Sequence, residues 1–384
     1  MRKTDFRFRE VEMIYLDNAA TSRKKPFGVY LALFTENLLS ANPGRGGHRA
    51  SLRTALKIEK VRDKIRDLFF DGDVVFTKNC TEALNLAFSA APKGKKVIAT
   101  TSAHTSVLRP LKRLFTQGKI ILKVVPSDFG SVLKEVDRDT GMVVLGAVSN
   151  VTGERTEVER ILKSVKEKSR AVTVVDGAQS AGKVDFDFTD VDLIASSGHK
   201  GLHGAQGTGF LIVKRGIKLS PLIVGGTGNS SFEIDIPDDV PGGMEAGTVN
   251  APGIIALGKG IDYTVRNKKR LIRKEKRMTE YLEKKLSSLS GIKVYSARNG
   301  IVLFNAEGVS CGEVADELSD RYGIYVRSGL LCAPLIHKEL GTAPDGAVRV
   351  SVGNNNHFWH LYYFLFAVKK ILQRANEKES ASIS

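Results

Sequence analysis

The middle of the chain alternates short apolar runs with polar stretches. Strands are predicted where an apolar run lies between turn residues. These runs are 73–77, 96–100, 120–125, 141–149, 171–176, 191–196 and 207–215. The segments 81–90 and 156–170 instead carry apolar residues at helical spacing and are predicted to be helices. Strands that alternate with helices are typical of an α/β domain, here with a mostly parallel, seven-stranded sheet.

The last third of the chain has a different pattern. It follows an irregular Gly- and Pro-rich passage at 221–253. Short apolar runs then predict three strands and a closing helix, at 301–308, 322–329, 347–353 and 357–375. We expect a large domain at 15–255 and a small α+β domain built from 1–14 and 256–384. The polar end, 376–384, is predicted to be disordered.

Length and composition allow one large hydrophobic core and a smaller second one, since 42% of the 384 residues are hydrophobic. No run of about 18 apolar residues occurs, and the charged N-terminus lacks the apolar centre of a signal peptide. We therefore expect a soluble cytoplasmic protein. Three cysteines, Cys80, Cys311 and Cys332, form no CxxC pair, so neither a disulfide framework nor a metal site is predicted.

The chain is basic, with a formal net charge of +16. Such a charge suits nucleic acid, acidic lipids or an acidic protein partner. Much of the excess lies at 266–286, however, where the apolar residues fall at helical spacing, namely Leu271, Ile272, Met278, Leu282 and Leu286. A helix with one buried face and one solvated basic face explains this segment, and no nucleic-acid-binding motif accompanies it. A non-catalytic protein that binds nucleic acid is the alternative from another class.

Several polar residues lie at the carboxyl ends of predicted strands, where parallel sheets bind ligands. Asn150, Asp176 and Lys200 lie at such ends, and Ser197 and His199 precede the lysine. A lysine desolvated in this position can act as a Schiff-base nucleophile toward an aldehyde, which indicates pyridoxal phosphate. That cofactor needs a carboxylate at its pyridine nitrogen, and Asp176 is the candidate.

The phosphate of such a cofactor needs hydrogen-bond donors. The segment FTKNCTEALNLAF, from 76 to 88, predicts a strand, a turn and a helix. Cys80, Thr81 and the free amides of the helix N-terminus are therefore candidates for an anion site. Taken alone, Thr81 is equally well explained as a helix cap.

Five segments together carry a resemblance to a known family. They are YLDNAAT at 15–21, DGAQSAG at 176–182, SSGHKGLHGAQGTG at 196–209, EAGTVNAPGI at 245–254 and VRSGLLCAP at 326–334. In this order they resemble class V aminotransferase-type, fold type I pyridoxal-phosphate enzymes, and chiefly the group II cysteine desulfurases and selenocysteine lyases. The resemblance implies the fold type I architecture, with a large cofactor-binding domain and a small α+β domain.

The resemblance also implies roles for residues around the cofactor ring. Lys200 matches the lysine that forms the Schiff base, and Asp176 matches the partner of the pyridine nitrogen. Gln179 matches a hydrogen-bond donor to the ring hydroxyl, and His104 matches the histidine that stacks on the ring. Without the resemblance, His104 is equally well explained as a half-buried histidine in a loop.

Around the phosphate, the matching positions are Cys80, Thr81, Ser197 and His199. Thr248 matches the threonine that reaches the phosphate of the neighbouring subunit, which implies a homodimer. The chain departs from the family at Cys80, where threonine is frequent, so the contribution of Cys80 is expected from its backbone amide.

Sulfur transfer needs a thiolate on an accessible loop near cationic groups. Cys332 meets this description, because it follows a short strand and lies between Arg327 and His337 in the sequence. The resemblance implies that Cys332 is the catalytic cysteine, and here the chain departs from the family in having Leu331 where histidine is common. Cys311 is better explained as a small buried hydrophobic residue.

An amino-acid substrate needs its carboxylate held, and a guanidinium does this through paired hydrogen bonds. The resemblance assigns this role to Arg349, and we count Asn150 and Arg327 with it as substrate-binding residues. Without the resemblance, Arg349 is explained as a solubility charge on an edge strand.

These observations predict a pyridoxal-phosphate-dependent cysteine desulfurase. It would convert L-cysteine to L-alanine and hold the sulfur as a persulfide on Cys332, for an acceptor protein or a reductant to remove. Lys200 is expected to move the Cα proton as general base and acid. The alternative within the class is a selenocysteine lyase, aminotransferase or epimerase in which Cys332 takes no part.

Overall fold

The structure is a computed structural model. It describes the backbone of residues 13–44, 47–227, 235, 237 and 239–383, with side chains described as far as Glu377. The expected small-domain segment 1–14 and the Gly- and Pro-rich passage 221–253 therefore lie partly outside the described residues. Within the described ranges, no helix is both long enough and apolar enough to cross a membrane.

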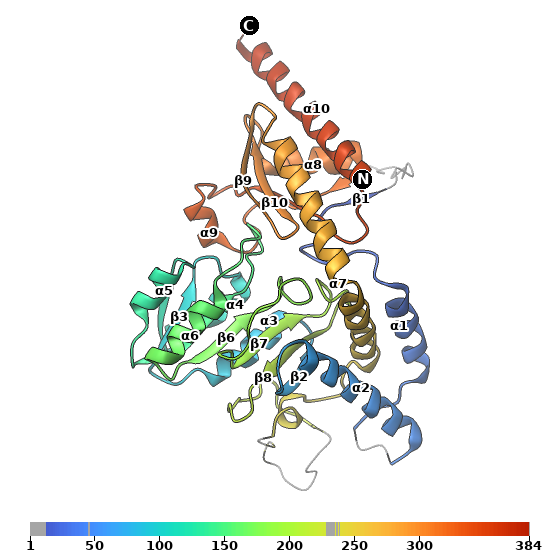
Figure 1. Cartoon of the computed structure of the whole chain (residues 1–384), viewed down its shortest axis with the longest axis vertical. Helices are drawn as coiled ribbons and strands as arrows, with labels where there is room; N and C mark the ends of the chain where they lie inside the picture. Colours follow the sequence, from blue (N-terminus) through green and yellow to red (C-terminus); the bar gives the residue numbers. More distant parts are fainter. Residues whose placement is uncertain (1–12, 45–46, 228–234, 236, 238, 384) are drawn as a thin grey trace, which may run out of the picture. The chain divides into compact units, whose positions relative to one another are not determined.

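The chain divides into two compact units (Figure 1). The large unit comprises the described residues of 24–150 and 155–269. The small unit comprises those of 1–23, 151–154 and 270–384. The domain boundaries at residues 15 and 255 stay a prediction from the sequence.

A seven-stranded sheet forms the centre of the large unit. Its strands, in spatial order, are β2 (Asp73–Thr77), β8 (Gly209–Val213), β7 (Leu193–Ser197), β6 (Val172–Asp176), β5 (Thr140–Gly146), β3 (Lys96–Thr100) and β4 (Ile121–Val125). β8 runs antiparallel to both neighbours, and all the other neighbouring strands are parallel. The prediction of a mostly parallel sheet is confirmed.

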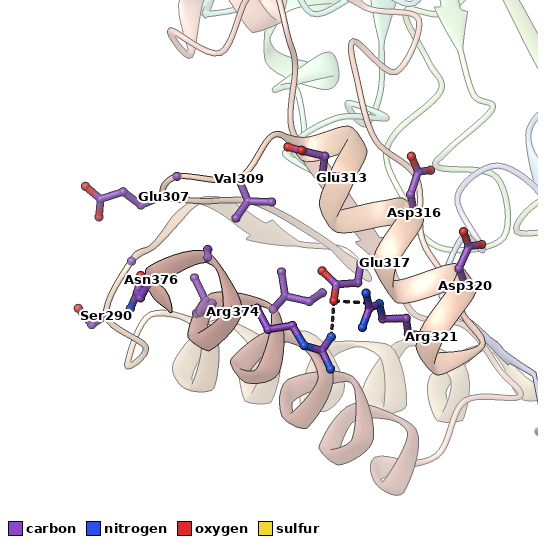
Figure 2. Close-up of a pocket in the computed structure, with 15 residues that line it drawn as sticks. Ser290, Glu307, Val309, Glu313, Asp316, Glu317, Asp320, Arg321, Arg374 and Asn376 are labelled. Carbon is purple, nitrogen blue, oxygen red and sulfur yellow. Dashed lines mark hydrogen bonds and ion pairs between the residues drawn. The ribbon is translucent and has the colours of Figure 1, made fainter. Parts of the chain in front are cut away.

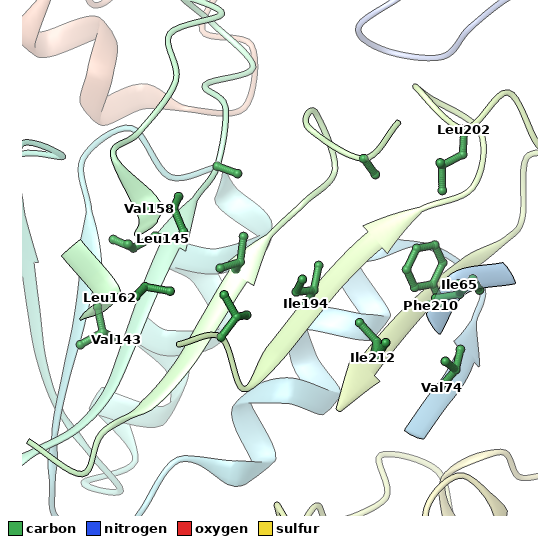
Figure 3. Close-up of a cluster of buried hydrophobic side chains, with 14 of the residues drawn as sticks. Ile65, Val74, Val143, Leu145, Val158, Leu162, Ile194, Leu202, Phe210 and Ile212 are labelled. Atoms are coloured by element: carbon green, nitrogen blue, oxygen red, sulfur yellow. The ribbon is translucent and has the colours of Figure 1, made fainter. Parts of the chain in front are cut away.

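Both faces of this sheet are covered by apolar side chains, because successive residues of a strand point to opposite faces. Val143 packs in one cluster with Ile194 and Ile212, whereas the adjacent Val144 packs in another with Leu211. Figure 3 shows the first cluster, in which Val158 and Leu162 of a helix meet the sheet. Burial on both faces explains why the strands read as continuous apolar runs.

The large unit also contains helices that precede α7 in the chain. They are α1 (Phe27–Leu39), α2 (Arg49–Leu68), α3 (Cys80–Ala87), α4 (Thr105–Thr116), α5 (Phe129–Glu135) and α6 (Val158–Lys168). α3 continues as a short 3-10 turn over Phe88–Ala90, and another such turn covers Gly242–Met244. The predicted helices at 81–90 and 156–170 are therefore confirmed within a few residues.

The small unit contains an antiparallel sheet in the order β12 (Val348–Ser351), β10 (Ile301–Ala306), β9 (Ile292–Arg298). A parallel pair joins β1 (Ile14–Tyr15) to β11 (Ile324–Tyr325). Three helices of this unit are α8 (Cys311–Tyr322), α9 (Pro334–Glu339) and α10 (Phe358–Ile383). The smaller α+β unit is thus present as predicted.

The basic segment at 266–286 is the second half of a longer helix, α7 (Ala251–Leu286). Met278, Leu282 and Leu286 are fully buried, as a helix with one apolar face requires. Ile272 was expected on that face, but its side chain is 38% exposed, because it is displaced by about 100° from the buried Leu271.

The predicted disorder of 376–384 is wrong for the backbone, because α10 continues to Ile383. Its composition explains the difference, since the segment contains Glu, Lys and Ala, which propagate a helix once its first turns are packed.

A buried ion pair fixes the loop that leads to α7. The Arg62 guanidinium of α2 donates to both carboxylate oxygens of Glu245, at 3.0 and 2.7 Å. The same carboxylate accepts the backbone N–H of Phe76 in β2 at 2.6 Å. Both side chains of the pair are about nine-tenths buried. The loop that carries Thr248 is therefore attached to the sheet and to α2.

We predict that Glu245→Ala lowers the free energy of unfolding by about 3–5 kcal/mol, because it leaves the Arg62 charge buried without this partner. Denaturant unfolding at pH 7 measures the effect. Glu59→Ala is the matched control, since Glu59 contacts the same guanidinium but is 52% exposed, and should cost about 1 kcal/mol or less. Equal losses in the two variants would contradict the importance of the buried pair.

Candidate functional site

Most of the predicted cofactor residues line one cavity of about 120 Å³ in the large unit. It lies at the carboxyl ends of β2, β3, β5, β6 and β7, where the chain leaves each strand. The predicted residues around it are Cys80, Thr81, His104, Asn150, Asp176, Gln179, Ser197, His199 and Lys200. The topology of the sheet brings together side chains that lie far apart in the sequence.

Asp176 ends β6 and is buried. Its Oδ1 accepts the backbone N–H of Ala178 at 2.9 Å and faces the Cys80 thiol, with 3.6 Å between Sγ and Oδ1. Burial, and next the charge of Asp176, raise the pKa of the Cys80 thiol, so the thiol stays protonated and donates. The side chain of Cys80 thus supports Asp176 and was not anticipated in that role.

The start of α3 can hold an anion. Asn79 caps the helix by accepting the backbone N–H of Glu82 at 2.9 Å, which leaves the earlier amides unused by this cap. Ser197 lines the same cavity, and its Oγ is buried without a hydrogen-bond partner. Thr81 is exposed at the helix start. A buried hydroxyl beside a helix N-terminus fits the phosphate of pyridoxal phosphate.

His104 is the N-cap residue of α4. Its Nδ1 accepts the backbone N–H of Ser106 at 3.0 Å, so the ring carries its proton on Nε2. The Ser106 hydroxyl lies 2.8 Å from the same nitrogen. Ser106 also lines the cavity and was missed in the sequence, although its spacing two residues after His104 is a capping pattern.

His199 is a neutral imidazole at physiological pH. Burial, and then the charges of Lys200 and Lys25, lower its pKa to about 4. Lys25 donates from Nζ to the backbone carbonyl of His199 at 2.6 Å, and burial lowers the pKa of Lys25 to about 8. Nothing in composition or spacing marks Lys25, which sequence reasoning missed.

The turn that bears Lys200 is anchored to α7. His203 has a positive φ of 55°, and its Nδ1 lies 3.0 Å from the Thr264 hydroxyl. The backbone N–H of His203 donates to the carbonyl of Lys200 at 3.0 Å. Lys200 is therefore held by a hydrogen-bonded turn at the end of β7.

Thr248 is not part of this cavity. It lies on the surface of the large unit, beside hollows lined by Ala55 and Asn42 on one side and by Phe76 and Leu222 on the other. Its expected role at the cofactor of a neighbouring subunit stays a prediction.

The small unit contains the predicted carboxylate-binding arginine. Arg349 is 3% exposed and lies in β12, so the explanation as a solubility charge on an edge strand is wrong. Its Nη2 donates to Asp17 at 2.8 Å, and Arg327 donates to the other oxygen of the same carboxylate at 3.0 Å. The structure brings together Arg327 and Arg349, two of the expected substrate-binding residues, through Asp17, which the sequence analysis did not single out.

Cys332 is the exposed cysteine of the chain, whereas Cys311 is buried and donates to the carbonyl of Asp345 at 3.2 Å. The prediction that Cys311 is a buried hydrophobic residue is confirmed. His337 was expected to help the Cys332 thiolate, and this is wrong. Its ring is buried, bonds to the Thr342 hydroxyl at 2.7 Å, and has its pKa lowered by burial, so it carries no charge at neutral pH.

The sequence pattern of the Aminotransferase class-V family matches residues 14–362. The chain belongs to this family. It is 34% identical to a probable cysteine desulfurase of Methanothermobacter thermautotrophicus, over 88% of this chain and 90% of that protein. A probable cysteine desulfurase of Pyrococcus abyssi is 33% identical over 94% of this chain and 95% of that protein.

Solved structures agree with the fold. A cysteine desulfurase of Thermococcus onnurineus superposes with a TM-score of 0.86 at 32% identity, over 94% of this chain and 95% of that chain. A cysteine desulfurase of Escherichia coli gives 0.82 at 26% identity, over 94% and 95%. The predicted class V resemblance and the fold type I architecture are confirmed.

We predict that His203→Asn removes part of the acid sensitivity of the fold. Burial, and then Lys183 and Lys25, lower the pKa of His203 to about 4, below the 6.5 of an unfolded histidine. The unfolded chain therefore takes up the proton first, and the stability contributed by the neutral ring is lost as the pH falls from 6.5 to 4. The loss amounts to about 3 kcal/mol.

Denaturant unfolding at pH 7 and pH 4.5 measures this difference. Asn tolerates the left-handed backbone of position 203, so the variant should fold and show a smaller loss than the unmodified protein. His357→Asn, at an exposed histidine, is the control and should keep the original pH dependence. An unchanged loss in His203→Asn would contradict the assignment.

Proposed function

We propose that the protein is a pyridoxal-phosphate-dependent cysteine desulfurase, which converts L-cysteine to L-alanine. The observation that carries the proposal is the cavity that joins Lys200, Asp176, His104 and the unpartnered hydroxyl of Ser197. The donor set matches the aldehyde, the pyridine nitrogen, the ring and the phosphate of that cofactor. Membership in the class V family, with cysteine desulfurases among its similar members, supports the same reaction.

Each residue would make a definite contribution to cofactor binding. Lys200 would hold the aldehyde carbon, Asp176 the pyridine nitrogen and Gln179 the ring hydroxyl, while His104 lies against the ring. The phosphate would be held by Thr81, Ser197, His199 and the backbone amide of Cys80. When bound, pyridoxal phosphate supplies the electron sink that makes the substrate Cα–H acidic.

The chain's own groups would bind the amino acid and move its protons. Arg349, with Arg327, would hold the substrate carboxylate through charge-assisted hydrogen bonds, and the family resemblance implies a substrate-binding role for Asn150 as well. The amine of Lys200 would take the proton from Cα and return a proton to the product.

Cys332 would take the sulfur. Its exposed thiolate sulfur forms a bond with the substrate sulfur while the substrate Cβ–S bond breaks. The electron pair of the broken bond stays with Cβ, which takes up a proton and becomes the methyl group of alanine. The enzyme is left with a persulfide, and an acceptor protein or a thiol reductant removes the outer sulfur.

We expect the purified protein loaded with pyridoxal phosphate to release alanine and sulfide in equal amounts from L-cysteine with a reductant. Cys332→Ser should lower both by at least about a hundredfold, since it removes the nucleophile. Cys311→Ser is the matched control at the buried cysteine. Borohydride should fix the cofactor covalently to the unmodified protein and not to Lys200→Ala.

Each outcome decides between the enzymes of this class. Covalent fixation of the cofactor without alanine from cysteine would favour an aminotransferase or epimerase. Release of alanine only from selenocysteine, with Cys332→Ser fully active, would favour a selenocysteine lyase. Failure to bind the cofactor would overturn the proposal.

We also propose that the protein is a homodimer. α1 exposes Phe27, Leu31, Phe34 and Leu38, which share one face of the helix and are 48–78% exposed. Leu52 and Leu56 of α2 are also exposed, and Ala55 of the same helix lines the hollow that Thr248 lines. A second copy that covers this surface would receive Thr248 at its cofactor, as the family resemblance implies. A cytoplasmic location stays a prediction from the sequence.

Phe34→Asp should convert the dimer to a monomer at micromolar concentration, because it places a charge in the apolar face. Sedimentation equilibrium measures the mass. Phe366→Asp, at an exposed phenylalanine of α10, is the control and should stay dimeric. A monomeric unmodified protein, or a dimeric Phe34→Asp, would contradict this surface as the interface.

A further inference from the structure

Asp17 links two arginines inside the small unit. Its Oδ1 accepts a hydrogen bond from Nη2 of Arg349 at 2.8 Å, and its Oδ2 accepts one from Nε of Arg327 at 3.0 Å. Asp17 is 7% exposed and Arg349 3%, so this pair is shielded from water. One carboxylate thus divides its two oxygens between two guanidinium groups.

Backbone hydrogen bonds hold the segments that carry these three side chains next to one another. Arg327 and Arg349 are antiparallel partners, which exchange two backbone hydrogen bonds of 3.2 and 2.7 Å. Asp17 is bridged in parallel to Ser351, whose backbone N–H donates to the carbonyl of Leu16 at 2.6 Å. The three charged residues therefore come from three adjacent extended segments, and their spacing is fixed by the sheet.

The three groups carry a net charge of +1, because two guanidinium groups face one carboxylate. Tyr15 lies beside them but adds no charge, since burial, and next Asp17, raise the pKa of its phenol. Arg23 lies over the Tyr15 ring at 5.6 Å and is exposed, so solvent screens its charge. Asp17 and Arg349 are buried, whereas the Arg327 side chain is 49% exposed, and the three groups together leave one positive charge for one further negative charge.

We propose that Asp17 is a specificity-determining residue, which sets the charge of the Arg327 and Arg349 pair so that the protein accepts amino acids with one carboxylate and rejects those with two. One carboxylate on Arg349 makes the cluster neutral. A second carboxylate would find no further positive charge among these three groups and would be repelled by Asp17. This inference rests on the proposed function, since it takes Arg349 as the group that binds the substrate carboxylate.

A second carboxylate in the small unit offers a matched control. Glu317 of α8 contacts Arg321 of the same helix and Arg374 of α10, as Figure 2 shows. This group lines an open hollow of about 900 Å³ with other acidic residues. Glu317→Gln removes one negative charge between two arginines, as Asp17→Asn does, but outside the Arg349 cluster.

The experiment measures the dissociation constants of L-alanine and L-aspartate by calorimetry, with the protein loaded with pyridoxal phosphate. We expect Asp17→Asn to raise the affinity for L-aspartate relative to L-alanine at least tenfold, because the cluster charge becomes +2. A structural distortion of the site alone would weaken the binding of both ligands equally and leave the ratio of their dissociation constants unchanged. Glu317→Gln should keep the ratio of the unmodified protein.

A second variant changes the cluster charge in the opposite direction. It also provides a test if Asp17→Asn does not fold. Arg327→Gln lowers the cluster charge to zero and should weaken L-alanine binding at least tenfold. A ratio within twofold of the unmodified protein in Asp17→Asn, or unchanged L-alanine binding in Arg327→Gln, would overturn the inference.

The result can be separated from that of the proposed function. If the unmodified protein releases no alanine from L-cysteine, the desulfurase proposal fails, while the binding ratio still tests Asp17. If it releases alanine and the ratio does not respond to Asp17→Asn, the reaction stands and only the role of Asp17 is wrong.

Discussion

The close packing of the turn after β7 is the constraint on which the candidate site depends. At Gly198 a Cβ atom would lie 2.3 Å from the Thr208 hydroxyl, and at Gly201 it would lie 2.3 Å from the carbonyl of Ala181. Neither position has room for a side chain. The backbone can therefore run directly against its neighbours and turn sharply, which leaves His199 and Lys200 at the edge of the cavity. The glycines of this segment allow close packing of the backbone, and the position of Lys200 depends on that packing.

Charge in the site is controlled by burial rather than by many ion pairs. His199 and His203 lie in the Lys200 turn, and desolvation is the largest cause of the low pKa of each ring. Cys80 stays a neutral donor to Asp176 for the same reason. The cavity is lined by neutral donors, one lysine and one carboxylate. Few other charges therefore compete with the interactions that an anion or a pyridine nitrogen would make there.

The strands and their end residues could be predicted because their signals are local. Apolar runs mark β2 to β8, and the polar residues at their ends follow from the rule for parallel sheets. Contacts that depend on the third dimension could not be predicted. Lys25 reaches the carbonyl of His199 across 174 positions of sequence, and Asp17 reaches Arg349 across 332. The direction of His337 is equally a tertiary property, since its helix places the ring inside the small unit.

The conformation around Cys332 gives Leu331 a structural role. Leu331 and Cys332 have φ values of 51° and 58°, a left-handed pair that costs about 1–3 kcal/mol for each residue. Such a turn persists only where packing holds it. Leu331 supplies that packing, because it lies in an apolar cluster with Val151, Leu303 and Ile336. A polar residue at 331 would lose this anchor, so the leucine supports a turn that presents the Cys332 thiol to solvent while its neighbour stays buried.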